Sequence, residues 1–275
     1  YDFLAKPFTP DELRSALFKA AKHLVIQREA RRLAEERKRV RFEFMRVVVH
    51  EMKAPLAAVE GYLMMMHDRT LGADLASYDR AIDRATTRLG GMRKLIVDLL
   101  DLTRIESGQK KRELASVDAV DAARSAMEVS TLAAAERGIT MELHADGPVP
   151  MMADREELEL VLNNLVSNAV KYNRDQGRVD VTVAREERGV VLRVADTGIG
   201  MSPEESARLF GEFVRIKNDR TRNIPGSGLG LSIVKKIAIL YGGDVSVEST
   251  PDVGTAFTVV LHDAAIEVAP AGGTA

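Results

Sequence analysis

The chain has 275 residues, of which 45% are hydrophobic and 29% charged, and its formal net charge is -2. This length suffices for two folded domains, and the small net charge gives no electrostatic basis for wrapping nucleic acid. The absence of cysteine excludes disulfide scaffolds, zinc ribbons and thiol nucleophiles. The absence of cysteine also fits a reducing compartment, and we expect a cytoplasmic location. No apolar run approaches the ~20 residues that a helix needs to cross a bilayer, so we expect no membrane segment in this fragment.

The first residues predict the end of a domain that lies mostly upstream. The segment D-F-L-A-K-P-F-T-P-D-E-L, residues 2–13, has no initiator methionine before it and resembles the last strand and helix of a receiver domain. In that family the lysine before a proline, here Lys6, contacts the phosphorylated aspartate. An extended lead into a helix explains the lysine-proline pair equally well. We expect residues 1–23 to be a receiver remnant, with a receiver domain N-terminal in the intact protein.

One helix is predicted from Thr9 and Pro10, a capping hydroxyl and a first-turn proline, to about Asp68. Apolar or small residues spaced three and four apart predict a coiled coil over residues 24–46 that dimerises the chain. Glutamates interleaved with the basic run of residues 28–41 favour a solvated helix surface over a nucleic-acid patch. The seam comprises Ile26, Ala30, Leu33, Val40, Phe44 and Val47.

A second helix with the same periodicity follows a break at residues 69–72 and ends near residues 107–109. Two long helices joined by a short turn form a hairpin, and two hairpins from a dimer form a four-helix bundle. We therefore expect a helical hairpin over residues 47–110 in a homodimer. The second seam comprises Leu75, Tyr78, Ile82, Ala85, Leu89, Met92, Ile96 and Leu99.

After residue 111 the periodicity changes to short alternating stretches, which predict half-buried strands. Three helical patterns lie between them, so residues 111–263 are expected to form a two-layer α/β sandwich, and the whole chain an α+β protein. Residues 264–275, rich in Ala, Pro and Gly, are expected to be a disordered tail. The expected strands are residues 139–144, 179–185, 190–196, 244–249 and 255–262, and the expected helices are residues 118–137, 154–173 and 227–241.

His50 is distinguished from the other four histidines by its neighbours. Glu51 follows it, and Pro55 interrupts the hydrogen bonding of a continuing helix at a cost of ~3 kcal/mol. An unprotonated imidazole nitrogen is a nucleophile, and a neighbouring carboxylate can accept or hold the other ring proton. Successive helical residues diverge by roughly 100°, so His50 and Glu51 can meet only through particular rotamers.

The segment N-N-L-V-S-N-A-V-K-Y, residues 163–172, places Asn164, Asn168, Lys171 and Tyr172 on one helix face. An apolar stripe on the other side of this helix is expected to pack on the sheet. Two amides and a lysine beside such a stripe can either bind a ligand or form an ordinary polar helix face.

Two glycine-rich segments complete the pattern. In D-T-G-I-G, Asp196 ends a strand and could accept a hydrogen bond from an adenine amino group, while Gly198 and Gly200 would let the backbone approach the base; alone, this segment is typical of a plain turn. In G-S-G-L-G, backbone N–H groups before a helix can point at an anion. This loop is neither a Walker loop nor a dinucleotide fingerprint, and it comprises Gly226, Ser227, Gly228, Leu229 and Gly230.

The histidine segment V-V-V-H-E-M-K-A-P-L and the three later segments, in this order, resemble the sensor histidine kinases of two-component signalling. The resemblance implies ATP and Mg²⁺ as cofactors, His50 as phosphoacceptor and Glu51 as general base. It makes Asn168 the Mg²⁺ ligand and a response regulator the partner. The other ATP-binding residues that the resemblance implies are Asn164, Lys171, Tyr172, Asp196, Gly198, Gly200, Gly226, Ser227, Gly228, Leu229 and Gly230, together with Arg215 in a basic lid.

Two rival functions remain open from the sequence. ATPases of the gyrase group share the sandwich, but they carry a glutamate four residues before the metal-binding asparagine, where this chain has Asn164. An amide cannot accept the proton of attacking water, so a kinase is preferred over a GHKL-type ATPase. A non-catalytic ATP-binding scaffold is the second rival. The resemblance also implies weak phosphatase activity, because Ala54 stands where the family commonly carries a water-positioning Thr or Asn.

Overall fold

The structure is a computed structural model that describes residues 9–72, 74–107, 112–187, 189–216, 218–222, 224 and 226–264. It divides into two compact units, Tyr1–Arg88 and Leu89–Ala275. The expected receiver contact of Lys6 lies outside the described residues. None of the described helices combines the length and the apolar character needed to span a bilayer.

The first unit is built on the long helix α1, Pro10–His67, which continues through Pro55 without a break. The second helix, α2, spans Leu75–Ser107. Between them, Gly72 has φ +81, a left-handed conformation that glycine adopts at no steric cost. Asp74 accepts a hydrogen bond from Ala76 N at 3.1 Å, which caps the start of α2. The predicted long helices and the break between them are thus confirmed.

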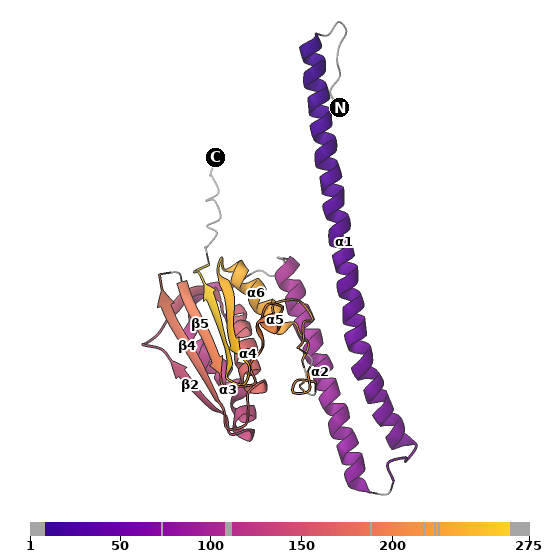
Figure 1. Cartoon of the computed structure of the whole chain (residues 1–275), viewed down its shortest axis with the longest axis vertical. Helices are drawn as coiled ribbons and strands as arrows, with labels where there is room; N and C mark the ends of the chain where they lie inside the picture. Colours follow the sequence, from indigo (N-terminus) through magenta and orange to yellow (C-terminus); the bar gives the residue numbers. More distant parts are fainter. Residues whose placement is uncertain are drawn as a thin grey trace, which may run out of the picture. The chain divides into compact units, whose positions relative to one another are not determined.

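The second unit contains a five-stranded mixed sheet in the order β2-β4-β5-β7-β6. Its β2–β4 pair is parallel and every other pair is antiparallel. Three helices cover one face of this sheet, which gives the expected two-layer sandwich (Figure 1). The strands are β2 Thr140–His144, β4 Arg178–Glu186, β5 Gly189–Asp196, β6 Asp244–Thr250 and β7 Gly254–Leu261. The helices are α3 Ala119–Glu136, α4 Arg155–Lys171 and α6 Gly230–Leu240.

Helix α4 provides the largest buried stripe of this unit. Its apolar residues Leu158, Val161, Leu162 and Leu165 have at most 1% of their surface exposed. They pack against strands in which buried and half-buried side chains alternate, as in β4. Burial of apolar surface contributes about 25 cal/mol per Å², so the contact between α4 and the sheet is the main stabilising layer of the unit. The same contact fixes the position of the polar face of α4.

Two strands and a short helix were missed by the sequence prediction. Strands β1, Leu114–Asp118, and β3, Pro150–Asp154, pair antiparallel in a separate two-stranded sheet. Their five-residue segments lack a clear alternation of buried and exposed residues, so period-two patterning does not reveal them. Helix α5, Pro203–Ser206, lies in the stretch expected as loop, where Ser202 and Glu205 form a capping box.

A polar network joins the chain after α2 to helices α4 and α6. Arg112 makes a bidentate ion pair with Glu157, with a shortest N–O distance of 2.8 Å, and lies 4.5 Å from the centroid of the Tyr241 ring. The Tyr241 hydroxyl donates to Glu157 at 2.8 Å and accepts from Asp154 N at 2.9 Å. Burial is the main cause that raises the pKa of Tyr241 to about 12. The network fixes the ends of three segments to one another.

Tyr241→Phe should lower the free energy of unfolding by about 1–3 kcal/mol, because a buried amide and a buried carboxylate each lose a partner. Chemical denaturation followed by circular dichroism measures this change. Tyr62→Phe in α1 is the matched control, since no hydrogen bond of its hydroxyl is found among the described residues. Equal unfolding free energies for the two variants would contradict the stabilising role of the network.

Candidate functional site

His50 lies on α1 with 82% of its side chain exposed. Its Nδ1 is 4.0 Å from Glu51 Oε1, which is close enough for an ion pair and too long for a hydrogen bond. The distance agrees with the divergence of neighbouring helical side chains. Ala54, one turn after His50, is exposed on the same side and offers only a methyl group.

The polar face of α4 is more buried at its start than the sequence suggested. Asn164 is 5% exposed, and its Nδ2 donates to Leu160 O of the preceding turn at 2.8 Å. Asn168 is half-buried. Tyr172 caps the helix through a 2.9 Å hydrogen bond from its N to Asn168 O. Asn164 therefore faces neighbouring protein, while Asn168, Lys171 and Tyr172 lie at the accessible end of the helix.

The loop after β5 is held against the end of α4 by backbone contacts. Asp196 Oδ1 accepts a hydrogen bond from Gly198 N at 2.8 Å, and Ile199 N donates to Tyr172 O at 3.1 Å. A β-carbon at Gly198 would lie 2.3 Å from Tyr172 O, and one at Gly200 1.9 Å from Thr250 O. Both glycines are therefore required by close backbone packing.

Burial raises the pKa of Asp196 to about 6, against the opposing effect of its backbone hydrogen bonds from Gly198 and Thr255. The carboxylate is thus ionised near neutral pH but carries a desolvation cost. Such a group gains from any donor that approaches its remaining lone pairs.

The loop Gly226–Gly230 packs on α4 from the other side. A β-carbon at Gly230 would lie 2.4 Å from Asn164 Oδ1, and one at Gly226 2.9 Å from Lys171 Nζ. Gly228 has φ +75 and faces the backbone of Phe213, itself at φ 57. Three of the predicted segments thus meet around the last turns of α4.

Positive charge gathers where these segments meet. The pKa of Lys171 is lowered to about 8, mainly by burial and then by the charges of Arg215 and Lys94. Arg215 also donates to Ile224 O at 2.7 Å, which holds part of the lid together. Crowded cations of this kind favour a bound polyanion, because an anion relieves their mutual repulsion.

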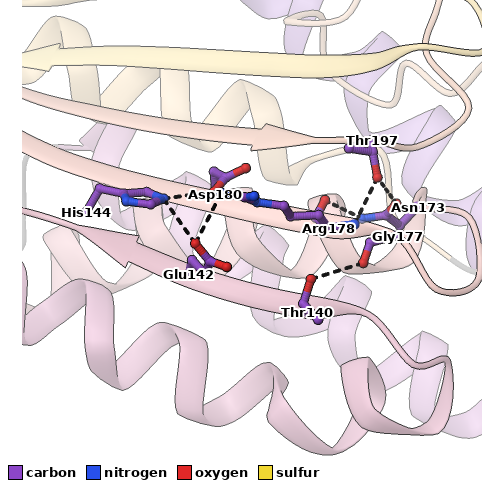
Figure 2. Close-up of polar contacts among 8 residues, drawn as sticks. All are labelled: Thr140, Glu142, His144, Asn173, Gly177, Arg178, Asp180 and Thr197. Atoms are coloured by element: carbon purple, nitrogen blue, oxygen red, sulfur yellow. Dashed lines mark hydrogen bonds and ion pairs between the residues drawn. The ribbon is translucent and has the colours of Figure 1, made fainter.

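A hydrogen-bond chain supports the Asp196 loop from the edge of the sheet (Figure 2). Thr197 Oγ1 accepts from Arg178 N at 2.9 Å and donates to Asn173 Oδ1 at 3.3 Å. The Arg178 guanidinium turns the other way, to Asp180 at 2.6 Å and to Glu142 at 3.1 Å. These contacts connect the loop to strands β2 and β4.

Figure 2 also shows three side chains that lie close enough together to be metal ligands: Glu142, His144 and Asp180. His144 Nε2 is 2.8 Å from Asp180 Oδ1, which also takes two hydrogen bonds from Arg178. Burial acts to raise the pKa of Asp180, but the hydrogen bonds and charges of Arg178 and His144 lower it below its ordinary value. Because the guanidinium already neutralises these carboxylates, we interpret the group as an ion-pair network of the exposed sheet face.

One hollow of about 390 Å³ lies between α3 and β2. None of the predicted site residues lines it. Its walls are Arg124, Met127, Glu128, Thr131, Ala134, Ala135, Ile139, Met141 and Leu143.

The sequence prediction missed two residues of α2 near the glycine loop. Asp98 accepts a hydrogen bond from Ser227 Oγ, and Lys94 Nζ lies 3.2 Å from Asp98 Oδ1. In the sequence, Lys94 and Asp98 occupy positions typical of the polar side of an amphipathic helix. In the sequence the only signal is an acidic residue between the seam positions Ile96 and Leu99, and it does not point to a partner 129 residues away.

Comparisons with known proteins agree with this arrangement. Residues 40–108 match the family described as His Kinase A (phospho-acceptor) domain. Residues 153–265 match the family described as Histidine kinase-, DNA gyrase B-, and HSP90-like ATPase. The two matches contain the histidine-bearing helix and the three segments that meet around α4.

The phosphate regulon sensor protein PhoR of Pseudomonas aeruginosa is 33% identical over 256 residues, which are 93% of this chain and 57% of PhoR. Full-length ShkA, solved in complex with AMPPNP, is 29% identical with a TM-score of 0.57, over 70% of this chain and 40% of ShkA. ThkA, solved in complex with the response regulator TrrA, is 22% identical with a TM-score of 0.63, over 80% of this chain and 60% of ThkA. The ThkA likeness supports the fold alone.

A histidine-bearing helix in a phosphoacceptor domain, followed by an ATPase-type sandwich, defines a phosphotransfer protein of two-component systems. The chain belongs to the sensor histidine kinases, and it spans about half the length of the relative PhoR.

The sequence-based prediction that Asp196 binds adenine and Lys171 binds phosphate implies that nucleotide affinity depends on pH through these two groups. Below pH about 6 the raised pKa of Asp196 leaves its carboxyl protonated and a poorer acceptor for an adenine amino group. Above pH about 8 the lowered pKa of Lys171 leaves it uncharged and unable to attract phosphate. We expect ADP to bind most tightly between these values, as measured by calorimetric titration.

Asp196→Asn should remove the acid limb of this profile and Lys171→Met the alkaline limb. The ratio of wild-type to variant affinity at each pH cancels the titration of the nucleotide itself. A ratio that stays constant across the range would contradict the assignment of both limbs.

Proposed function

We propose that the chain is an ATP-dependent protein-histidine kinase that phosphorylates His50 and passes the phosphoryl group to an aspartate of a response regulator. The observation that carries the proposal is the meeting of the Asp196 loop, the glycine loop and the end of α4 in a chain that also bears an exposed histidine. The domain limits predicted from the sequence, with a hairpin over residues 47–110 and an ATP-binding domain over residues 111–263, are part of the proposal.

In the proposed nucleotide site, the Asp196 carboxylate accepts a hydrogen bond from the adenine amino group, and the backbone of Gly198 and Gly200 lies beside the base. Lys171, Arg215 and the N–H groups of the glycine loop attract the phosphates, helped by the positive end of the α6 dipole. Tyr172 lies against the nucleotide. Its ring is 5.4 Å from Lys171 Nζ, so the two side chains form one surface.

Mg²⁺ is the proposed metal, with Asn168 as its protein ligand. Hard Mg²⁺ takes oxygen ligands and is commonly bound by one or two protein groups together with phosphate oxygens. Asn168 fits this role because it is half-buried one turn before Lys171, whereas the Asn164 amide already contacts Leu160 O and Gly230. The metal would neutralise charge on the phosphates.

His50 supplies the nucleophile in the proposed reaction. An unprotonated ring nitrogen attacks the γ-phosphorus, its bond to phosphorus forms as the bond to the β–γ bridging oxygen breaks, and ADP leaves. Glu51 takes up the proton of the other ring nitrogen. From the 4.0 Å separation, Glu51 needs only a rotamer change to reach hydrogen-bond distance.

A homodimer is the proposed assembly of the helical unit. Large apolar side chains of α1 and α2 stay exposed in the single chain, and a bundle interface would cover them. A response regulator is the proposed phosphoryl acceptor, in keeping with the complex of ThkA and TrrA. The exposed residues include Phe42, Met45, Val49, Leu56, Leu63, Met64, Leu75 and Ile82.

A kinase is favoured over an ATPase by the state of Asn164. Its side-chain nitrogen is occupied by Leu160 O and its oxygen faces Gly230, so it neither offers a carboxylate nor reaches an open site. An ATPase of this fold would need a base there to take the proton of attacking water.

Incubation with γ-labelled ATP should give an acid-labile, base-stable label on the protein, and His50→Gln should abolish it. His67→Gln is the matched control, because His67 is equally exposed on the same helix and should leave labelling intact. Release of free phosphate without a label would identify an ATPase. ATP binding with neither outcome would identify a scaffold.

Ala54→Thr should raise the rate at which the chain dephosphorylates its response regulator by about ten-fold or more, since a positioned hydrogen-bonding group contributes ~10²–10⁴ to proton-transfer steps. The assay is run in a His50→Gln background, so that no new phosphoryl group is supplied. Ala57→Thr, exposed on the same helix, is the control. Rapid dephosphorylation by the chain with Ala54 intact would contradict the weak phosphatase activity expected here.

A further inference from the structure

Asp98 is a buried carboxylate that the proposed reaction does not use. It belongs to the part of α2 that lies in the unit Leu89–Ala275, and it is 2% exposed. Ser227 Oγ donates to Asp98 Oδ2 at 2.5 Å, while Lys94 Nζ lies 3.2 Å from Oδ1. Both oxygens therefore have partners, and one of these partners is a member of the glycine loop.

The surroundings of Asp98 are those expected for a phosphate group. Ser227 also accepts a hydrogen bond from Leu229 N at 3.2 Å, so the carboxylate is bound through the first residues of the loop before α6. Lys171, whose Nζ lies beside Gly226, is close enough for the charge of Asp98 to favour its protonated form. A hydroxyl and two ammonium groups around one carboxylate resemble the donors that bind a phosphate oxygen.

We propose that Asp98 is an internal competitor of the nucleotide phosphates, so that docking of α2 on the glycine loop holds this domain in a state of low nucleotide affinity. This inference rests on the proposed nucleotide site. A phosphate bound by the same donors would lie beside the Asp98 carboxylate, and the two negative groups would repel each other in a partly dehydrated site. Phosphate binding therefore requires the Asp98–Ser227 contact to open, and loss of that contact frees the Ser227 hydroxyl and takes the Asp98 charge away from Lys171.

A second contact shows how the docked state is retained and released. Lys236 of α6 pairs with Glu106 in the last turn of α2, and also with Glu212 of the lid at 2.7 Å. Glu106 is half-exposed, so solvent weakens this pair. The buried Asp98–Ser227 contact is the stronger of the two contacts that hold α2 on this domain. The Lys236–Glu106 pair at the end of α2 is the weaker one, so α2 can separate from the domain starting at that end.

The test compares nucleotide affinity in wild type, Asp98→Ala and Asp98→Asn, with the full chain in every case. Binding of AMPPNP should tighten about five-fold or more in both variants, the lower end of typical coupling between two sites. Binding of adenosine, which has no phosphate, should stay unchanged. Asp83→Ala, an exposed aspartate earlier on α2, is the control and should leave both affinities unchanged.

Unchanged or weaker AMPPNP binding in both Asp98 variants would overturn the proposal. An equal gain for AMPPNP and adenosine would overturn it too, because that result indicates a general loosening of the domain. Asp98→Asn keeps the size and a hydrogen bond of the side chain, so its result stands if Asp98→Ala fails to fold. These affinities are independent of His50 labelling, so failure of the kinase assignment and failure of this inference are distinguishable.

Discussion

Close packing between helix α4 and the glycine loop is the constraint on which the site depends. The apolar side of α4 is buried on the sheet, which leaves its polar side at a fixed distance from the loop before α6. Gly230 leaves no room for a β-carbon, which would lie 2.4 Å from Asn164 Oδ1, whereas at Gly226 the closest atom is the movable end of the Lys171 side chain. Stability and the proposed function are therefore coupled here, because the contact that completes the fold also aligns the groups proposed to bind phosphate.

The sequence predicted most of this architecture because the patterns that carry it are strong. Five sheet strands and three sandwich helices follow from alternation and from helical spacing, and the helix ends agree with the structure within a few residues. The sequence prediction missed strands β1 and β3 because their five residues, with one buried position in β1 and three in β3, give no regular alternation. Short elements of this kind are defined by pairing with a partner distant in sequence.

The candidate site was predictable to a different degree in each part. The glycines, Asp196 and the amide-rich helix stand in short local motifs, and the structure brings these segments together. The burial of Asn164 against Gly230 was not predictable, since the two residues are 66 positions apart and only the packing of two helices joins them. The contact between Asp98 and Ser227 was not predictable either, because no residue near Asp98 on α2 indicates Ser227 as its partner.

The two ends of the proposed nucleotide site differ in chemistry: main-chain atoms line one end and charged side chains line the other. Around Asp196 the walls are main chain, and β-carbons at Gly198, Gly200 and Gly254 would collide with carbonyl oxygens. Around Ser227 the groups are charged side chains on helices and a lid. Dissolved ions screen charges but do not alter steric fit. Added salt should therefore weaken the binding of the phosphates, while the binding of the base should change little.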